Sequence, residues 1–551
     1  MKIETAWVAP PPAIGGLDHL GTQAPCVLIY SQLLPGITNV TDRARYYSFY
    51  PWLVWSYDAR PFSKDDPAQF IEFFRRADCL FTLISERHAR TTDHDHERHG
   101  VAMVGRVQLV SALNRLEASV SLRLSHFTAQ ESPHRYFQNP MGGLAQYYAG
   151  TLTNLKLMDT SAKPWIKYTN EYGAPLAEQV NATVPGDRFW TVIEADEVTL
   201  DDLDALSAFC ACYIPNSPDE CQTLTDIYFD TQHVYEDEGQ QRRRSLALIQ
   251  QLVDALPDGH DLTEERFRAC VYTGALPATQ PWTLPEALSP TRVHWALYVR
   301  NDLLSVACQV ILAVLLRELQ PQTAAERRSF HTIEAFATWF AATPAILAAL
   351  GDFDADSFGD FLEQTRQQVP ELNAWEEPQH EIQQVRKLLD GWNRGEPTEV
   401  LIAQALRLLG TLIIRDDPDQ LPYGHLAISA EALTDYPINL ASFRQRVTHW
   451  RMIRVSEMLA DLATWCLNTH LKVALRKLRQ TGRSTFHLRP TERGLEVVGT
   501  EIPPPAPTNP RFSPAVQILR DIGVLTRDQS AQKGQTRLTT VGRQFMEAAS
   551  V

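Results

Sequence analysis

The densest group of potential metal ligands lies between residues 91 and 100, in the sequence TTDHDHERHG. Imidazole and carboxylate groups bind Zn2+ and Mn2+, so a metal-dependent nuclease or hydrolase would use His94, His96 and His99. The H-x-H-x-x-H spacing lacks the i, i+4 histidine pair of a catalytic H-E-x-x-H helix. We therefore favour a solvated polar loop here, and we expect no metal and no other cofactor in the protein.

A second group of potential ligands consists of Cys210, Cys212 and Cys221. No fourth ligand stands at the spacing of a zinc ribbon, which favours structural thiols. The eight cysteines occur mostly in apolar helical contexts, as is typical of reduced thiols in the cytoplasm. Residues 1–21 lack the pattern of a secretory signal, and the longest nearly uncharged apolar run, residues 303–316, is too short to cross a bilayer. We expect a cytoplasmic protein without a membrane partner.

Signatures of catalysis are missing from the sequence. There is no G-x-S-x-G elbow, no Walker A motif, no kinase motif set and no H-E-x-x-H. His294, Arg300 and Asp302 could form an acid–base group, but such residues more often anchor a buried helix to its neighbours. The sequence does not decide whether the protein is an enzyme, and it favours a protein without catalysis.

Charge is unevenly distributed along the chain, whose net charge is −15. Residues 441–551 carry 17 Lys and Arg against 8 Asp and Glu, whereas the preceding 440 residues carry 34 against 58. Such asymmetry suits contact between the C-terminal part and a polyanion; the alternatives are a solvated helix face and docking on the acidic part. Helical spacing would place Lys472, Arg476 and Arg479 together in a row suited to phosphates. The full set of candidate nucleic-acid-binding residues is Lys472, Arg476, Lys477, Arg479, Arg483, Lys533 and Arg537.

The order of elements in residues 139–180 is typical of the last part of a winged-helix domain. An apolar helix is followed by a polar turn, a short strand and a helix that begins at a Thr-x-x-x-Gly step. The same order recurs in residues 509–549, and both copies begin with Asn-Pro. Winged helices bind DNA or act as protein–protein modules, so two such modules favour one of these functions.

Residues 35–57 form the stretch around which the chain is organised. Seven of the twelve residues from Tyr46 to Tyr57 are aromatic, and a helix that is apolar nearly all round is buried. Pro51 should kink this helix or end its first part. Arg43 and Arg45 enter the same environment and need partners, because an unpaired buried charge is costly. The structural motif comprises Asp42, Arg43, Arg45, Tyr46 and Trp52.

This stretch resembles a signature of uncharacterised prokaryotic proteins. The residues that carry the resemblance are the turn PGIT at 35–38, the run DRARYY at 42–47, and Phe49, Pro51 and Trp52. Those proteins resemble products of mobile-element or anti-phage defence neighbourhoods, and the match covers about 20 of the 551 residues. The resemblance implies a bacterial, cytoplasmic, defence-linked component and names no reaction.

We expect a mainly α fold with small β wings, organised as a multi-domain helical protein with winged-helix-like modules. The expected domains are an aromatic N-terminal domain at 1–185, an acidic middle domain at 186–400 and a basic C-terminal domain at 401–551. Our first hypothesis is a non-enzymatic subunit of a defence system that binds double-stranded DNA, partner proteins of the same system, or both. The alternatives are a metal-dependent nuclease or hydrolase that uses the histidine cluster, and a pure protein–protein scaffold.

Overall fold

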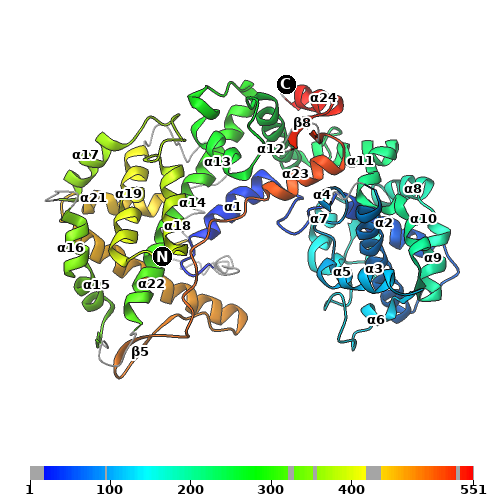
Figure 1. Cartoon of the computed structure of the whole chain (residues 1–551), viewed down its shortest axis with the longest axis horizontal. Coiled ribbons are helices and arrows are strands. Elements are labelled where there is room, and N and C mark those ends of the chain that lie inside the picture. Colours follow the sequence, from blue (N-terminus) through cyan, green and yellow to red (C-terminus); the bar gives the residue numbers. More distant parts are fainter. Residues whose placement is uncertain are drawn as a thin grey trace, which may run out of the picture. The chain divides into compact units, whose positions relative to one another are not determined.

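The computed structural model describes residues 18–92, 96–320, 328–351, 357–416, 436–528 and 534–549. This part of the chain is mainly helical, and its strands form four separate two-stranded antiparallel sheets (Figure 1). The expectation of a mainly α fold with small β elements is confirmed.

The chain forms two compact units, each built from segments that are distant in sequence. Unit 1 comprises Met1–Tyr30, Glu265–Leu284 and Ser289–Pro510, and unit 2 comprises Ser31–Glu264, Pro285–Leu288 and Arg511–Val551. The boundary expected after residue 185 lies inside unit 2, and the boundary expected after residue 400 lies inside unit 1. The contact-defined units therefore differ from three consecutive domains, because the C-terminal segment packs with residues from the first half of the chain.

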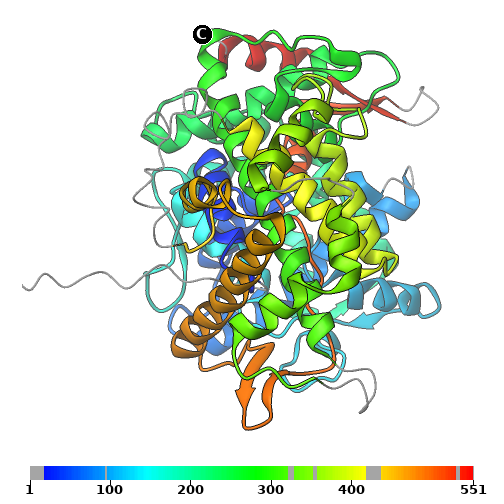
Figure 2. The ribbon, with the colours of Figure 1, turned by 90° about the vertical axis from the view of Figure 1, so that its left-hand side faces the viewer.

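Unit 1 is a helical assembly around one long apolar helix, α14. The helices α18, α19, α21 and α22 pack against α14. In addition, α15 packs against α22, and α17 packs against α19 and α22. Figure 2 shows α22 leading towards the hairpin of β5 and β6. The elements are α1 (Gln23–Leu33), α13 (Glu264–Thr273), η4 (Pro277–Thr279), α14 (Ser289–Leu319), α15 (Ile333–Ala341), α16 (Pro344–Gly351), α17 (Phe358–Gln368), α18 (Glu381–Asn393), α19 (Thr398–Arg415), α21 (Leu440–Trp450), α22 (Val455–Thr481), β5 (Leu488–Thr491) and β6 (Gly494–Val497).

The helix α14 is long and apolar enough to cross a membrane by length and composition alone. Its most apolar window is 94% buried within the structure, as in the core helix of a folded domain. Asp302, in the middle of α14, accepts hydrogen bonds from the Thr508 backbone N–H (2.8 Å) and hydroxyl (2.7 Å) and pairs with Arg268. This polar group therefore anchors neighbouring segments to the helix.

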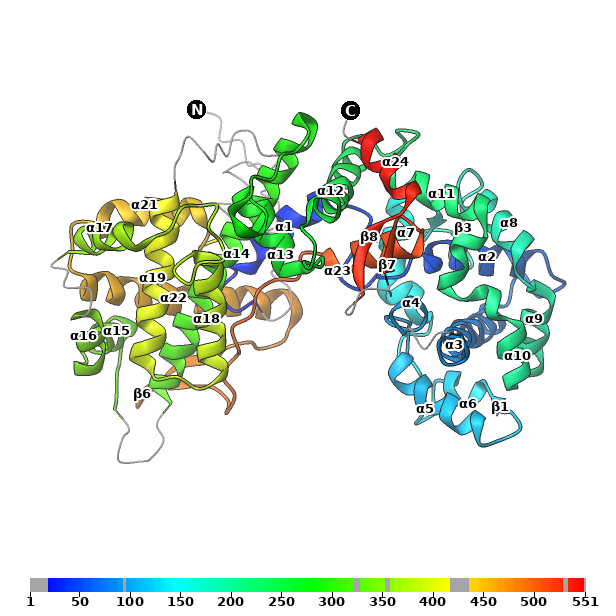
Figure 3. The ribbon, with the colours of Figure 1, turned by 45° about the horizontal axis from the view of Figure 1, so that its top comes forward.

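Unit 2 surrounds the aromatic helix α2 (Figure 3). Its elements are α2 (Arg45–Asp58), α3 (Pro67–Thr91), α4 (His96–His99), α5 (Arg106–Glu117), β1 (Leu122–Arg123), α6 (Ser125–Thr128), η1 (Leu144–Tyr148), α7 (Ala149–Asn154), β2 (Met158–Asp159), β3 (Lys167–Tyr168), α8 (Gly173–Thr183), α9 (Gly186–Ala195), β4 (Glu197–Val198), α10 (Leu200–Ala205), η2 (Ser207–Phe209), η3 (Ala211–Asn216), α11 (Pro218–Phe229), α12 (Glu236–Ala255), η5 (Glu286–Leu288), α23 (Phe512–Asp521), β7 (Leu525–Asp528), β8 (Gln535–Leu538) and α24 (Thr540–Ala549).

Helix α2 is buried on nearly all sides, as its composition predicts. Tyr46 and Trp52 are fully buried, and the Phe49 ring stacks on Phe81 with a centroid distance of 4.1 Å. The Tyr46 hydroxyl accepts a hydrogen bond from the Val104 backbone N–H (2.9 Å), which ties the helix to the segment before α5. Pro51 lies inside α2 and does not end it.

The two arginines before and at the start of α2 have the partners that their burial requires. Arg43 Nε lies 3.0 Å from Asp521 of α23, and Arg45 Nη1 lies 2.5 Å from Glu220 of α11. All four side chains are buried. Asp42 is half-buried and belongs to neither pair; burial raises its pKa to about 6, against the opposing effect of the Arg43 charge.

Two helix–hairpin–helix segments of unit 2 share one hydrogen-bond framework. The first runs from α7 through β2 and β3 to α8, and the second from α23 through β7 and β8 to α24. In the first copy, the Leu157 N–H donates to the Leu152 carbonyl oxygen at the end of the first helix (2.8 Å), and the Thr169 N–H donates to the Leu157 carbonyl oxygen across the hairpin (3.0 Å). In the second copy, the Val524 N–H donates to the Leu519 carbonyl oxygen (2.9 Å), and the Thr539 N–H donates to the Val524 carbonyl oxygen (3.1 Å).

The last helix of each copy begins in the same way. A threonine hydroxyl oxygen accepts the N–H of a glycine, from Gly173 to Thr169 (2.9 Å) and from Gly542 to Thr539 (3.0 Å). A Cβ at either glycine would lie 2.2 or 2.3 Å from the carbonyl oxygen of the residue before the hairpin. Glycine is therefore required at both positions, which are the first residue of α8 and the third residue of α24. The threonine stands four residues before the glycine in the first copy and three residues before it in the second.

Loss of the Arg45 cation should destabilise unit 2 strongly. In Arg45→Met, Glu220 would remain buried without its cation, at a cost of about 3–5 kcal/mol. The matched control is Arg386→Met, which breaks an exposed pair with Glu265 and should cost less than about 1 kcal/mol. Urea unfolding followed by tryptophan fluorescence measures both losses, and equal losses would show that burial does not set the strength of the Arg45 pair.

Candidate metal centre

Four potential metal ligands meet in unit 2. They are His88 in the last turn of α3, His99 at the end of α4, and Cys210 and Cys212 at the start of η3. Their ligand atoms all lie within 4.8 Å of one another. The Nδ1 atom of His99 lies 3.3 Å from Cys210 Sγ, and that of His88 lies 3.4 Å from Cys212 Sγ. His99 and Cys210 are buried, whereas His88 and Cys212 are half-buried.

Arg43 and Arg45 of the structural motif bind the backbone near His99 and near Cys210. Arg43 Nη1 donates to the carbonyl oxygens of His99 (3.2 Å) and Val101 (3.1 Å), and its Nη2 donates to that of Arg98 (2.7 Å). Arg45 Nη2 donates to the carbonyl oxygen of Ala208 (3.1 Å), two residues before Cys210. The backbone at both ligand segments is thus fixed by charge-assisted hydrogen bonds, which are stronger than neutral ones.

Hydrogen bonding and burial shift the pKa values of the two thiols in opposite directions. Burial alone would raise the pKa of the Cys210 thiol, but hydrogen bonds from Cys212, His88 and His99 bring it below its ordinary value. The hydrogen bond to Cys210, together with burial, raises the pKa of Cys212.

The donor set suits a divalent ion with tetrahedral S2N2 coordination. With Zn–S bonds near 2.3 Å and Zn–N bonds near 2.0–2.1 Å, neighbouring ligand atoms of a tetrahedron lie about 3.3–3.8 Å apart. The distances of 3.3 and 3.4 Å between nitrogen and sulfur fall in this range. Four protein ligands would leave no open coordination position for a substrate or an activated water, as in structural rather than catalytic zinc sites.

Of the three histidines that the sequence suggested as metal ligands, the described structure places one in this group. His99 belongs to the centre, His94 lies outside the described residues, and the structure does not describe the side chain of His96. The partners of His99 come from a C-x-C pair more than 100 residues later and from the preceding helix. Cys221 stands apart, since its Sγ donates to the Ile522 carbonyl oxygen (3.3 Å).

The candidate nucleic-acid-binding residues of α22 divide into exposed and buried groups. Lys472, Arg479 and Arg483 are exposed, and Arg476 is half-buried. Lys477 is not part of this surface, because it is 3% exposed and its Nζ donates to the Asp18 carbonyl oxygen (2.6 Å). Sequence spacing alone could not reveal this difference, since the N-terminal segment that covers Lys477 is far away in the chain.

The remaining two candidates belong to the other unit. Arg537 is exposed on β8 and donates to Gln535 Oε1 (3.2 Å), and Lys533 lies outside the described residues. The basic C-terminal part is therefore divided, since residues 441–510 belong to unit 1 and residues 511–551 to unit 2. The first segment carries 11 Lys and Arg against 5 Asp and Glu, and the second 6 against 3.

A group of neutral histidines lies beside Lys477 in unit 1. The His487 backbone N–H donates to His470 Nε2 (2.9 Å), and His470 Nδ1 lies 3.1 Å from the His19 carbonyl oxygen. Burial lowers the pKa of His470 to about 4 and that of His19 to about 3, and the neighbouring imidazoles and Lys477 act in the same direction. A proton on His470 Nε2 would face a backbone N–H, so this contact requires the neutral ring.

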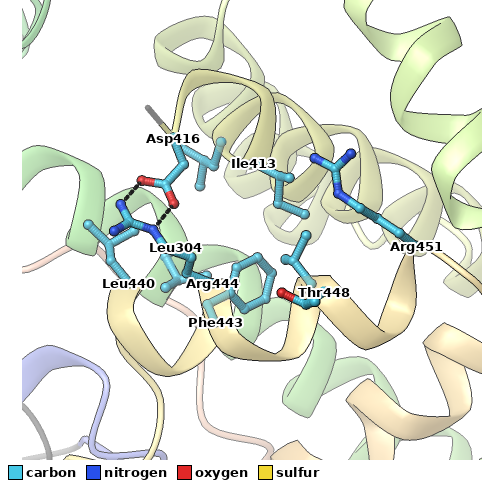
Figure 4. Close-up of a pocket in the computed structure, with 10 residues that line it drawn as sticks. Leu304, Ile413, Asp416, Leu440, Phe443, Arg444, Thr448 and Arg451 are labelled. Carbon is cyan, nitrogen blue, oxygen red and sulfur yellow. Dashed lines mark hydrogen bonds and ion pairs between the residues drawn. The ribbon is translucent and has the colours of Figure 1, made fainter. Parts of the chain in front are cut away.

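A small cavity of about 160 Å³ lies between α14, α19 and α21 (Figure 4). Leu304, Leu440 and Phe443 contribute apolar walls, and Arg444 forms a two-bond ion pair with Asp416, at 2.6 Å for each bond. Pockets for small ligands usually measure about 300–1,000 Å³. Because the cavity is smaller and Asp416 already pairs with Arg444, we do not assign a ligand to it.

Searches with this chain found no matching protein-family model, no matching curated protein and no matching solved structure.

Acid should destabilise unit 1 through His470. The folded pKa of about 4 lies below the ordinary value of 6.5, so the unfolded chain binds more protons between these pH values and the free energy of unfolding falls as the pH falls. The loss at pH 4 should reach about 3 kcal/mol at most. His470→Gln, whose amide oxygen can accept the His487 N–H without titrating, should weaken this pH dependence in urea unfolding. The exposed control His449→Gln should not, and an equal effect of both variants would contradict the assignment.

Proposed function

We propose that the protein is a non-enzymatic helical subunit that binds double-stranded DNA through the basic face of α22. We define this basic face as Lys472, Arg476 and Arg479 on the helix together with Arg483 in the turn that follows it. The observation that carries the proposal is the absence of acidic residues from Leu462 to Thr491, together with the exposure of three of the four cations. Among the described residues, no carboxylate pairs with Lys472, Arg479 or Arg483.

The spacing of these cations suits a row of phosphates. Lys472, Arg476 and Arg479, at i, i+4 and i+7, lie on one side of α22 and extend over about 11 Å, and Arg483 follows in the turn after the helix. A duplex carries one phosphate charge per about 1.7 Å of its axis, so a row of this length meets several of them. Gly482, with a φ of 70°, ends α22 next to Arg483, and nothing lies within 4 Å of its Cβ position. The turn is therefore open to a ligand.

The helix–hairpin–helix copies are assigned a different role within this proposal. A winged-helix domain reads DNA with an exposed helix, but Ser513 is the one exposed residue of α23. The exposed residues of η1 and α7, which include Gln146, Thr153 and Asn154, contain no cation. We propose that both copies are winged-helix-like modules for packing and assembly with partner proteins, and that Arg537 on the second wing adds a peripheral phosphate contact.

The resemblance of residues 35–52 to a signature of defence-linked proteins supplies the setting of the proposal, a bacterial cytoplasmic system with partner proteins. The alternative of a metal-dependent nuclease or hydrolase is less well supported, because the ligand set around His99 has four protein ligands and no open position. The scaffold alternative predicts no DNA binding and is tested together with the proposal.

DNA binding by the full chain should depend steeply on salt and on α22. Fluorescence anisotropy of a short labelled duplex across a salt series measures both effects. Lys472→Glu/Arg479→Glu/Arg483→Glu should weaken binding and reduce the slope of log K against log salt by about 2–3, since each phosphate contact contributes about 0.9. Lys477 is left unchanged because its ammonium group has a structural partner.

The matched control makes the same change of charge elsewhere in unit 1. Arg366→Glu/Arg386→Glu/Lys387→Glu reverses three exposed cations outside the basic face. We expect its affinity and salt slope to stay near those of the wild type. Equal losses in both variants would indicate a general effect of net charge, and no binding of the wild type at low salt would overturn the DNA proposal and favour a scaffold.

A further inference from the structure

We propose that His88, His99, Cys210 and Cys212 bind one Zn2+ in a closed structural site within unit 2. The proposal is independent of the DNA proposal, because α22 belongs to unit 1. It rests on four ligand atoms within 4.8 Å of one another, with nitrogen–sulfur distances of 3.3 and 3.4 Å. The bound ion would link the last turn of α3 and the end of α4 to the start of η3.

The chemistry of the donors selects the ion. Two sulfur and two imidazole ligands in a tetrahedral arrangement favour Zn2+ over Mg2+, Ca2+ and Mn2+, which prefer oxygen ligands. Binding forms two Zn–S and two Zn–N bonds, and the protons of any thiol that is still protonated pass to solvent. Zn2+ with two thiolates and two neutral imidazoles carries no net charge, so a largely buried site does not hold an uncompensated charge.

The surrounding structure prepares the site before the ion binds. Arg43 and Arg45 fix the backbone on either side of the centre by hydrogen bonds to carbonyl oxygens at 98, 99, 101 and 208. The ligands of one segment lie more than 100 residues from those of the other, so a bound ion would close a long loop. Cross-links that close long loops lower the entropy of the unfolded chain, and we expect the ion to raise the thermal stability of unit 2.

Metal analysis of the purified full chain tests the site. Inductively coupled plasma mass spectrometry should find about one Zn2+ per chain. The zinc content should fall at least about tenfold in Cys210→Ser/Cys212→Ser. The matched control is Cys221→Ser, which removes a half-buried thiol outside the centre and should keep the ion. His88→Ala/His99→Ala should also lose it, whereas His94→Ala/His96→Ala should keep it.

A second measurement stays informative if the cysteine variant does not fold. Addition of Co2+ to the metal-depleted wild type should produce the visible and thiolate charge-transfer bands of tetrahedral Co2+ with sulfur ligands, and Zn2+ should remove them. Zn2+ should also slow thiol modification of Cys210 and Cys212, but not of Cys221. A wild type that takes up neither ion under reducing conditions, or retention of full zinc by both double variants that lack proposed ligands, would overturn the proposal.

Discussion

Unit 2 depends on the burial of two guanidinium groups. Charges this deep are tolerated only where opposite charges and hydrogen-bond acceptors surround them. Arg43 pairs with Asp521 from α23 in the C-terminal segment, and Arg45 pairs with Glu220 from α11. Arg43 Nη1 donates to the carbonyl oxygen of His99, and Arg45 Nη2 donates to that of Ala208 in the segment that leads to Cys210. The same pair of side chains thereby joins the aromatic helix, the C-terminal segment and the candidate metal centre.

This arrangement gives a physical reason for the composition of residues 42–47. The aromatic side chains that follow the arginines exclude water, which strengthens each hydrogen bond of the guanidinium groups and raises the cost of losing one. A substitution at Arg43 would leave Asp521 buried and would also release three carbonyl oxygens. The motif is therefore constrained by its structural role, whatever ligand or partner the protein binds.

Local sequence patterns revealed a good part of this fold. The run of aromatic residues predicted the buried helix α2, and the need for partners of Arg43 and Arg45 followed from the cost of a buried charge. The repeated order of helix, hairpin and helix was also visible, down to the Thr-to-Gly step. These features depend on neighbouring residues, where helical periodicity and backbone sterics act.

The partners themselves could not be identified from the sequence. Asp521 lies 478 positions from Arg43, and Glu220 lies 175 positions from Arg45. The same limit hid the candidate metal centre, because His99 was visible in its histidine cluster whereas Cys210 and Cys212 lacked any local fourth ligand. Lys477 had the spacing of a phosphate contact, yet a distant backbone carbonyl binds it. Each of these contacts is made by segments that only the tertiary fold brings together.

Hydrogen exchange in an Asp521→Asn variant tests the central role of the buried guanidinium groups most directly. The substitution removes the charge next to Arg43 and keeps the size of the side chain. We expect faster exchange at amides 98–104, the segment that Arg43 holds, with a smaller change in α9 and none in α18 of unit 1. Unchanged exchange at 98–104, or an equal increase throughout unit 2, would contradict the conclusion that Arg43 orders this segment.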